Sequence, residues 1–385
     1  MTEYLYYLIA FACGAATVLG VWALRRTLHR GRAGDPEEVR RLLLHGAYQI
    51  LNGDLRKAAE AYTTIIQEHQ GQEEVYFVLG RLLRQLGEVE RAARLHQSLA
   101  LHHETRDPKL KLAAALELAE DYRVAERPDL ALDVLDDLIL HLPREPEPAE
   151  RLAMLAIQEG KWETAVKALA RLERLVGRRF DSLMGHLLAC RALELIEAGD
   201  LKLVKGVAKA AVKRAPGGGH AHFALARAFE ALGNPRRAFR ALYDGAKAQP
   251  AAAMVLLPEL RRLAGENGWL GEYDEILSDC LNYAMPLPEI ARAEQAIRLE
   301  SEGQAEEARN MVRPLLARGC RLPPVLAVAQ GLDLTNSTPE AAPYECAVCG
   351  AARDDFSWHC AECGGWDTFL PPVEAAARDV TEPWT

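Results

Sequence analysis

Four cysteines near the end of the chain have the residue type and the spacing of a metal site. They occur as two copies of the motif Cys-x2-Cys-Gly, with Cys346 and Cys349 in the first copy and Cys360 and Cys363 in the second. Each motif bends two thiolates toward one point, and the glycine that follows permits a tight turn in which backbone N–H groups face the sulfurs. Two such motifs make a tetrahedral four-thiolate site for one iron or zinc ion.

The same spacing limits what the site does. Half of the eight cysteines fall in the short segment 346–363, a clustering that favours a metal in a reducing compartment over two local disulfides. Because the protein supplies all four ligands and leaves no open position, we expect a structural metal rather than a catalytic one. The spacing does not decide between iron and zinc. His359 directly precedes Cys360, and we expect it beside the site and not among the ligands.

We expect residues 340–372 to form a small rubredoxin-like metal-binding domain, followed by a tail at 373–385. A domain of this size depends on its metal to fold. Its core is expected to contain four aromatic residues: Phe356, Trp358, Trp366 and Phe369. From residue 337 onward the sequence has nine acidic residues and only two arginines, which gives this segment a net charge of −7. The net charge of the whole chain is −9. Such acidity argues against a nucleic-acid-binding ribbon.

The segment before these motifs, residues 35–334, is an internal repeat. Eight turn residues recur at nearly regular intervals: Gly53, Gly87, Glu126, Gly160, Gly199, Gly233, Gly268 and Gly303. Five positions after each turn stands a small or apolar residue: Ala58, Ala92, Ala131, Ala165, Val204, Ala238, Tyr273 and Ala308. Seven positions before the turn every unit has glycine or alanine, except the seventh, which has Arg261. The third and seventh units are therefore degenerate.

Small residues at matching places in two antiparallel helices let their backbones approach closely, and the glycine between them ends the first helix. The pattern resembles the tetratricopeptide repeat, whose period is about 34 residues. It predicts an all-α solenoid of about eight helix pairs, with a concave surface of the kind that binds peptides or partner proteins. We expect breaks between units at residues 143–148 and in the glycine run 217–219.

Residues 1–33 predict a transmembrane helix with a basic segment after it. Residues 4–24 contain no charge, and a helix of that length spans a hydrocarbon core of ~30 Å. Four arginines follow at once: Arg25, Arg26, Arg30 and Arg32. The positive-inside rule places them in the cytoplasm, so the N-terminus faces out and the bulk of the chain is cytoplasmic. A cleaved signal peptide would need its basic residues before the apolar stretch.

The order of these parts, an anchor, a repeat array and a pair of cysteine motifs, resembles the lipopolysaccharide assembly protein B family of Gram-negative bacteria. The most specific likeness lies in the motif residues around the cysteines: Tyr344, Gly350, Trp358, His359 and Trp366. Ala361 departs from the proline that we expect in the second motif. The resemblance covers essentially the whole chain, whereas the repeats alone do not identify the family.

This resemblance implies a single-pass protein of the bacterial inner membrane that works as an adaptor. The family restrains lipopolysaccharide synthesis: it acts with a membrane-bound AAA metalloprotease and favours degradation of the deacetylase that commits carbon to lipid A. Other lipopolysaccharide assembly proteins are further expected partners. The resemblance also implies that the rubredoxin-like module packs against the repeats. Whether the chain forms a homo-oligomer stays open.

No motif predicts catalysis. The chain has no Ser-His-Asp order, no phosphate loop of the form GxxxxGK[ST] and no HExxH, so we expect an adaptor and not an enzyme. Two other functions remain open. One is a redox or metal-sensing regulator that carries iron at the four cysteines. The other is a chaperone for envelope-biosynthesis assemblies that has no link to proteolysis.

Overall fold

The computed structural model describes residues 36–68, 73–101, 108–249, 252–282, 288–320, 322–334 and 344–370. The predicted membrane anchor and the predicted tail lie outside these ranges. Within the ranges, no helix combines the length and the apolar character that crossing a membrane requires.

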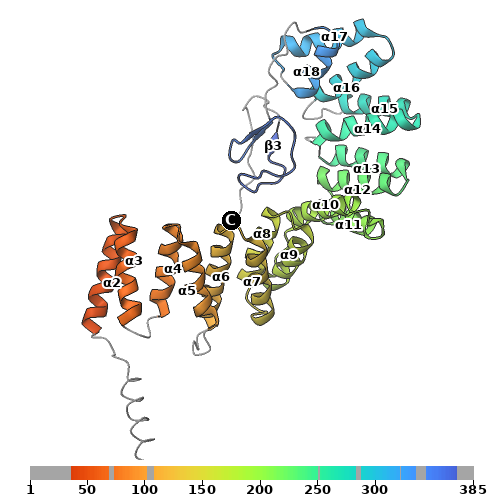
Figure 1. Ribbon diagram of the computed structural model, residues 1–385. Helices are drawn as coiled ribbons and strands as arrows, with labels where there is room; N and C mark the ends of the chain where they lie inside the picture. The colour runs from red at the N-terminus through yellow and green to blue at the C-terminus, as the bar shows by residue number, and fades with distance from the viewer. Residues whose placement is uncertain are drawn as a thin grey trace, which may run out of the picture. The chain divides into compact units, whose positions relative to one another are not determined.

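The described residues form seventeen helices and three short strands, in two compact units, Met1–Arg151 and Leu152–Thr385. In each unit, successive helices pack as antiparallel pairs (Figure 1). The first unit contains α2 (Pro36–Leu51), α3 (Leu55–Glu68), α4 (Glu73–Gln85), α5 (Val89–Leu101), α6 (Pro108–Val124), α7 (Pro128–His141) and the start of α8 (Glu147–Gln158). The second unit continues with α9 (Trp162–Val176), α10 (Asp181–Glu197), α11 (Leu201–Arg214), α12 (Gly219–Ala231), α13 (Pro235–Ala248), α14 (Ala253–Asn267), α15 (Leu270–Asn282), α16 (Pro288–Ser301), α17 (Ala305–Ala317) and α18 (Pro323–Gly331).

The turns inside the helix pairs adopt the conformation that the repeat predicts. All eight turn residues have positive φ, from 57° at Glu126 to 81° at Gly87. This left-handed residue ends the first helix, and the residue after it donates its N–H to a carbonyl five positions back, as Asp54 does to Gln49. Glu126 takes the same conformation although it is not glycine. The third unit is therefore degenerate in sequence but regular in structure.

The small residues lie at the helix crossings, as the repeat requires. All eight residues that stand five positions after a turn are fully buried. The seventh unit replaces the small residues with a polar trio. Tyr273 donates its hydroxyl to the buried carboxylate of Glu294 at 2.7 Å, and Arg261 donates its Nε to the same oxygen at 2.8 Å. The buried glutamate thus accommodates the two residues that break the pattern.

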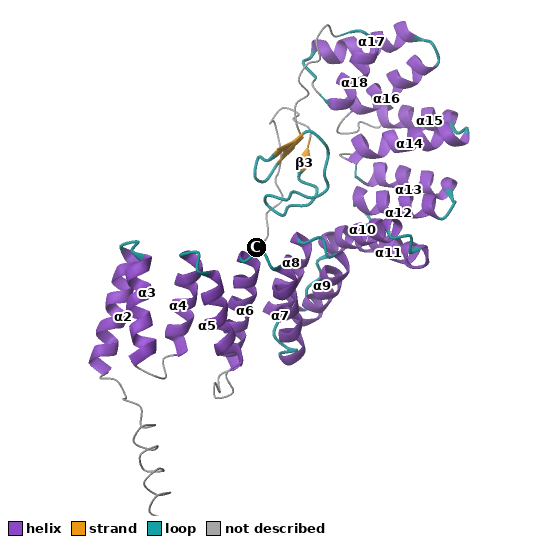
Figure 2. Ribbon diagram, viewed as in Figure 1, coloured by secondary structure: helices purple, strands orange, loops and turns teal. Residues whose placement is uncertain are grey.

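The cysteine motifs belong to a small sheet of three strands, which the sequence did not predict. The strands are β1 (Tyr344–Cys346), β2 (Ala352–Arg353) and β3 (Phe369–Leu370), and strands are drawn in orange in Figure 2. They pair antiparallel in the order β2-β1-β3. In the register, Tyr344 faces Arg353 and Cys346 faces Phe369. The predicted all-α class thus holds for the repeat array alone, and the domain bounds 340–372 stay a prediction.

One buried core in the second unit joins the module to the repeats. The core cluster contains residues of α12 to α18 and also Tyr344, Cys346, Cys360 and Phe369 of the module. Because the two parts share one apolar core, the cysteine motifs are held against the helices and do not stand apart from them. In the structure the module therefore packs against the repeats, as the family resemblance implies.

Candidate metal centre

The two cysteine motifs form turns with matching hydrogen bonds. In the first, Gly350 donates its N–H to the carbonyl of Cys346 at 2.8 Å. In the second, Gly364 donates in the same way to Cys360 at 2.8 Å. Both glycines have positive φ, 75° and 72°, a conformation that side chains disfavour. The glycine after each motif is thus required by the turn that aims the two thiols.

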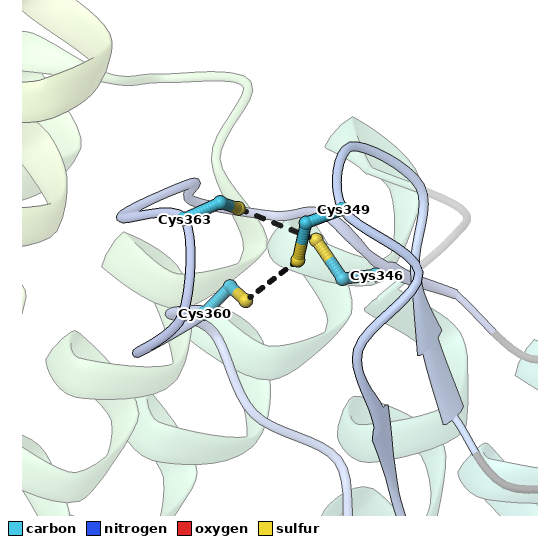
Figure 3. A group of neighbouring side chains, drawn as sticks. All are labelled: Cys346, Cys349, Cys360 and Cys363. Carbon is cyan, nitrogen blue, oxygen red and sulfur yellow. Dashed lines mark hydrogen bonds between the residues drawn. The ribbon is translucent and has the colours of Figure 1, made fainter. Parts of the chain in front are cut away.

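The turns bring all four thiols together. Each Sγ lies within 4.8 Å of the others, with 3.5 Å between Cys346 and Cys363 and 3.6 Å between Cys349 and Cys360 (Figure 3). A tetrahedral ion bound at ~2.3 Å from each sulfur places the sulfurs about 3.8 Å apart. The donor set and its spacing therefore fit one tetrahedral ion. That these four residues bind the ion stays a prediction, as does the choice between iron and zinc.

The electrostatics of the thiols also fit a bound cation. Burial opposes ionisation of Cys346, but hydrogen bonds from the Thr368 hydroxyl and from backbone N–H groups outweigh it and lower the pKa of this thiol to about 6. Desolvation by the surrounding atoms, together with the neighbouring thiols, raises the pKa of the largely exposed Cys363 to about 12. One thiolate is thus stabilised by the protein alone, whereas its partner needs a positive charge nearby. A bound metal ion would supply that charge.

The site has an inner and an outer side. Cys346 and Cys360 are buried, whereas Cys349 and Cys363 are exposed. His359 is half-buried and packs its ring against Trp366, with 4.4 Å between the centroids. It lies beside the four thiols and outside the cluster that can hold an ion, as the sequence led us to expect.

Two of the four aromatic residues predicted for the core of the module also contact the repeats. Phe369 is buried and belongs to the core, but Trp358 and Trp366 stack on histidines of the repeats. Trp366 lies on His186 of α10, with centroids 4.8 Å apart and planes 19° apart. Trp358 lies on His220 of α12, with the corresponding values 4.9 Å and 13°. The two tryptophans therefore attach the module to the array, and Trp358 also packs edge-on against Phe356 of the module at 4.8 Å.

Hydrogen bonds link the two histidines to each other and to Asp367 of the module. His186 Nδ1 and His220 Nδ1 are 3.1 Å apart, and His186 Nε2 lies 3.2 Å from Asp367 Oδ2. Neutral imidazoles satisfy both contacts in one way: His220 donates from Nδ1 to His186, and His186 donates from Nε2 to the carboxylate. We call this set of His186, His220, Trp358, Trp366 and Asp367 the junction.

Gly219 lets α12 pack closely against the start of α14. A Cβ at this position would lie 2.5 Å from Cβ of Ala252 and 3.4 Å from the ring of Trp358. Its N–H also donates to the side-chain oxygen of Gln249 at 2.5 Å. The sequence predicted a break between units at 217–219, and the run does separate α11 from α12. Gly219, however, is the first residue of α12 and is needed for packing.

The histidines of the junction were missed by the sequence reasoning, although a signal for them exists. His186 and His220 lie one repeat period apart, and each stands thirteen positions before the turn of its unit, Gly199 or Gly233. A polar aromatic residue that recurs at the same repeat position in consecutive units indicates that these positions lie on one surface of the array. The repeat pattern could therefore have identified the surface, but not the module that covers it.

We predict that acid weakens the junction. Burial, with the neighbouring His186, lowers the pKa of His220 well below its ordinary value of 6.5. When the module is undocked, the imidazole of His220 titrates near ~6.5, so below that pH the undocked state binds more protons. The docked state therefore has its full stability above about pH 6.5 and loses it as the pH falls. Hydrogen exchange in α10 and α12, corrected for intrinsic rates, should be faster at about pH 5.5 than at about pH 7.5.

The matched variant for this test is His220→Phe. It keeps a ring against Trp358 but cannot be protonated, so its exchange should depend less on pH than that of the wild type. The metal content is measured at both pH values, because loss of the ion would also release the module. The same pH dependence in the variant and the wild type would contradict the role of His220.

Comparisons with known proteins find similarity both to the repeats and to nearly the whole chain. The tetratricopeptide repeat family model matches residues 46–109. Lipopolysaccharide assembly protein B of Escherichia coli K12 is 21% identical over 96% of this chain and 98% of its own length. The protein of the same name from Haemophilus influenzae is 22% identical over the same shares. A solved tetratricopeptide repeat protein from Parabacteroides merdae is 13% identical over 78% of this chain and 100% of its own length, with a TM-score of 0.34.

The two matches to lipopolysaccharide assembly protein B cover 96% of this chain, so they concern nearly its whole length and not one common repeat. They point to a non-enzymatic scaffold built on tetratricopeptide repeats. The resemblance that the sequence indicated is confirmed: along nearly its whole length this chain is similar to the lipopolysaccharide assembly protein B proteins.

Proposed function

We propose that this chain is an inner-membrane adaptor of lipopolysaccharide assembly that promotes degradation of the lipid A deacetylase by a membrane AAA metalloprotease. One observation carries the proposal: the match to proteins named lipopolysaccharide assembly protein B spans 96% of this chain and 98% of theirs. A shared repeat alone would support only a general binding role. The match in the complete order of parts supports a shared function.

The physical roles divide among these parts. Repeat arrays offer extended surfaces on which partner proteins bind. In this chain the module closes the core of the second unit and fixes the inner faces of α10 and α12 through the junction. The predicted anchor at 4–24 would confine the chain to the plane of the membrane. Confinement raises the effective concentration of a membrane protease and a deacetylase held by the same adaptor.

Depletion of the chain in its host tests the proposal. We expect deacetylase abundance, measured by immunoblot, to rise after depletion and to return when the wild-type chain is expressed again. The rise should disappear in a strain that lacks the protease, because the enzyme is then degraded equally slowly with and without the chain. Unchanged deacetylase levels after depletion would contradict the proposal and favour the envelope-assembly chaperone.

The exposure of two cysteines favours a second candidate, a regulator that responds to metal supply or oxidation. Cys349 and Cys363 face solvent, and exposed thiolate sites exchange and react more readily than buried ones. The test compares chains loaded with iron and with zinc for deacetylase binding. Equal binding by both forms would exclude an iron-dependent switch, whereas binding by the iron form alone would support it.

A further inference from the structure

The exposed side of α11 in the second unit is strongly basic. This helix of 14 residues has five basic residues and no acidic residue. The helices α7 and α15 take the same place in their own repeat units, and each has four acidic residues and neither lysine nor arginine. The whole chain has a net charge of −9. The positive charge of α11 is therefore a local feature and not a consequence of composition.

The lysines of α11 share one side of the helix. Val204, Ala208 and Ala211 form its buried side, in one apolar core with residues of α10 and α12. With about 3.6 residues per turn, the four lysines fall within an arc of about 80° on the solvent side. All four are exposed, and we call them the lysine face: Lys202, Lys205, Lys209 and Lys213.

Carboxylates of the protein do not neutralise the lysine face. None of its four side chains forms an ion pair with any residue that the structure describes. Other cations nearby are paired: Arg214 of the same helix binds Glu173, and Arg236 of α13 donates to both oxygens of Glu272 at 2.9 and 2.7 Å. The lysine face thus keeps its full charge toward solvent.

The spacing of these lysines lowers the stability of the helix. Lys205, Lys209 and Lys213 stand four positions apart, so that neighbouring lysines repel each other along α11. A carboxylate at one of these places would turn the repulsion into attraction. An anionic partner outside the protein has the same effect, because it faces all the lysines at once.

The residue types favour a phospholipid surface as that partner. Lysine is a compact charge on a flexible stem, which suits headgroups spread over a plane, whereas a single carboxylate or phosphate is recognised best by the fork of arginine. The first turn of α11 also exposes two large apolar side chains, Leu201 by 38% and Leu203 by 56%. Basic residues with exposed leucines beside them are typical of helices at a membrane interface.

We propose that the lysine face of α11 binds the surface of a membrane that contains anionic phospholipids, with Leu201 and Leu203 entering the headgroup region. Each lysine near such a surface strengthens binding about fivefold. The contact orients the second unit with α11 toward the lipid, in addition to the tether that the predicted anchor at 4–24 would supply. It requires neither the protease nor the deacetylase, so it goes beyond the proposed adaptor function.

The reactivity of the lysines in the full chain tests this contact. The chain is placed in lipid nanodiscs of phosphatidylcholine alone or with about 30% phosphatidylglycerol. An amine-acylating reagent is added, and mass spectrometry gives the labelling rate of each lysine. The lysine face should be labelled at least about threefold more slowly in the anionic discs. Lys57 of α3, which is exposed and paired with Asp54, should be labelled equally in both. Salt at about 0.5 M should remove the difference, because it screens the attraction.

Two double variants with the same change of charge separate the lysine face from the total charge. Lys205→Glu, Lys209→Glu should abolish the difference at the other two lysines of the face. Denaturant unfolding should show no loss of stability in this variant, because the substitutions remove repulsion along α11. Lys57→Glu, Arg91→Glu changes exposed residues of α3 and α5 and should keep the slower labelling of the lysine face.

Equal labelling of the lysine face in both kinds of disc, or the same slowing at Lys57, would overturn the proposal. Slowing that arises in phosphatidylcholine discs only after the deacetylase is added would make the face a protein-binding site and would also overturn it. The depletion experiment measures deacetylase abundance and not lipid contact, so a failure of the adaptor function is distinguishable from a failure of this proposal.

Discussion

Replacing Cys346 and Cys349 by serine is expected to unfold the C-terminal module and to abolish the function of the chain. Structural zinc in small peptides contributes about 10–16 kcal/mol to folding, whereas whole domains have a net stability of about 5–15 kcal/mol. The module has three strands of two or three residues each, so without the ion it has little internal structure of its own to keep it folded. Its loss should free Trp358 and Trp366 from the repeats.

Metal content and hydrogen exchange measure this effect together. The double variant should bind no stoichiometric metal, and exchange should rise in α10 and α12, which the module covers in the wild type. Cys320→Ser is the matched control, because Cys320 is half-buried and lies outside the four-thiol cluster. If the double variant kept its junction and returned deacetylase abundance to its normal level in depleted cells, the assignment of a structural role to the metal would be wrong.

Replacing Asp121 by alanine is expected to destabilise the first unit by about 1–3 kcal/mol. The change removes the carboxylate that joins Arg84 to the buried His96, and Arg84 keeps only its contacts with Glu117. The cost falls mainly on His96, because its Nδ1 loses its partner while the ring stays buried. Denaturant unfolding of the full chain, followed by hydrogen exchange in α4 to α6, measures the loss in the unit concerned.

The neighbouring Glu120→Ala is the control for this prediction. Glu120 bonds only to Arg123 of its own helix, near the surface, and such pairs contribute at most about 1 kcal/mol. A loss of similar size in both variants would show that the His96–Asp121–Arg84 chain is not specially important.

The repeat array could be predicted because each unit carries its own local signal. Glycine at the turn and a small residue five positions later are both dictated by contacts within one helix pair. The same locality explains why the cysteine motifs could be recognised, since one turn aims each pair of thiols. Even the irregular third and seventh units keep the fold, through positive φ at Glu126 and through the buried carboxylate of Glu294.

The junction could not be predicted, because its two halves lie far apart in the sequence. Trp358 and Trp366 look like core residues of a small domain, and only the fold shows that they pack on His220 and His186. The strands of the module were missed for a different reason. Segments of two or three residues are too short to show the alternation that identifies a strand.

Reconstituted proteolysis tests the central claim most directly. The deacetylase and the membrane protease are placed in lipid vesicles with or without the full chain, and the half-life of the deacetylase is measured. The adaptor account predicts that the wild-type chain shortens this half-life and that the Cys346→Ser, Cys349→Ser chain does not. The same half-life with and without the wild-type chain would contradict the account.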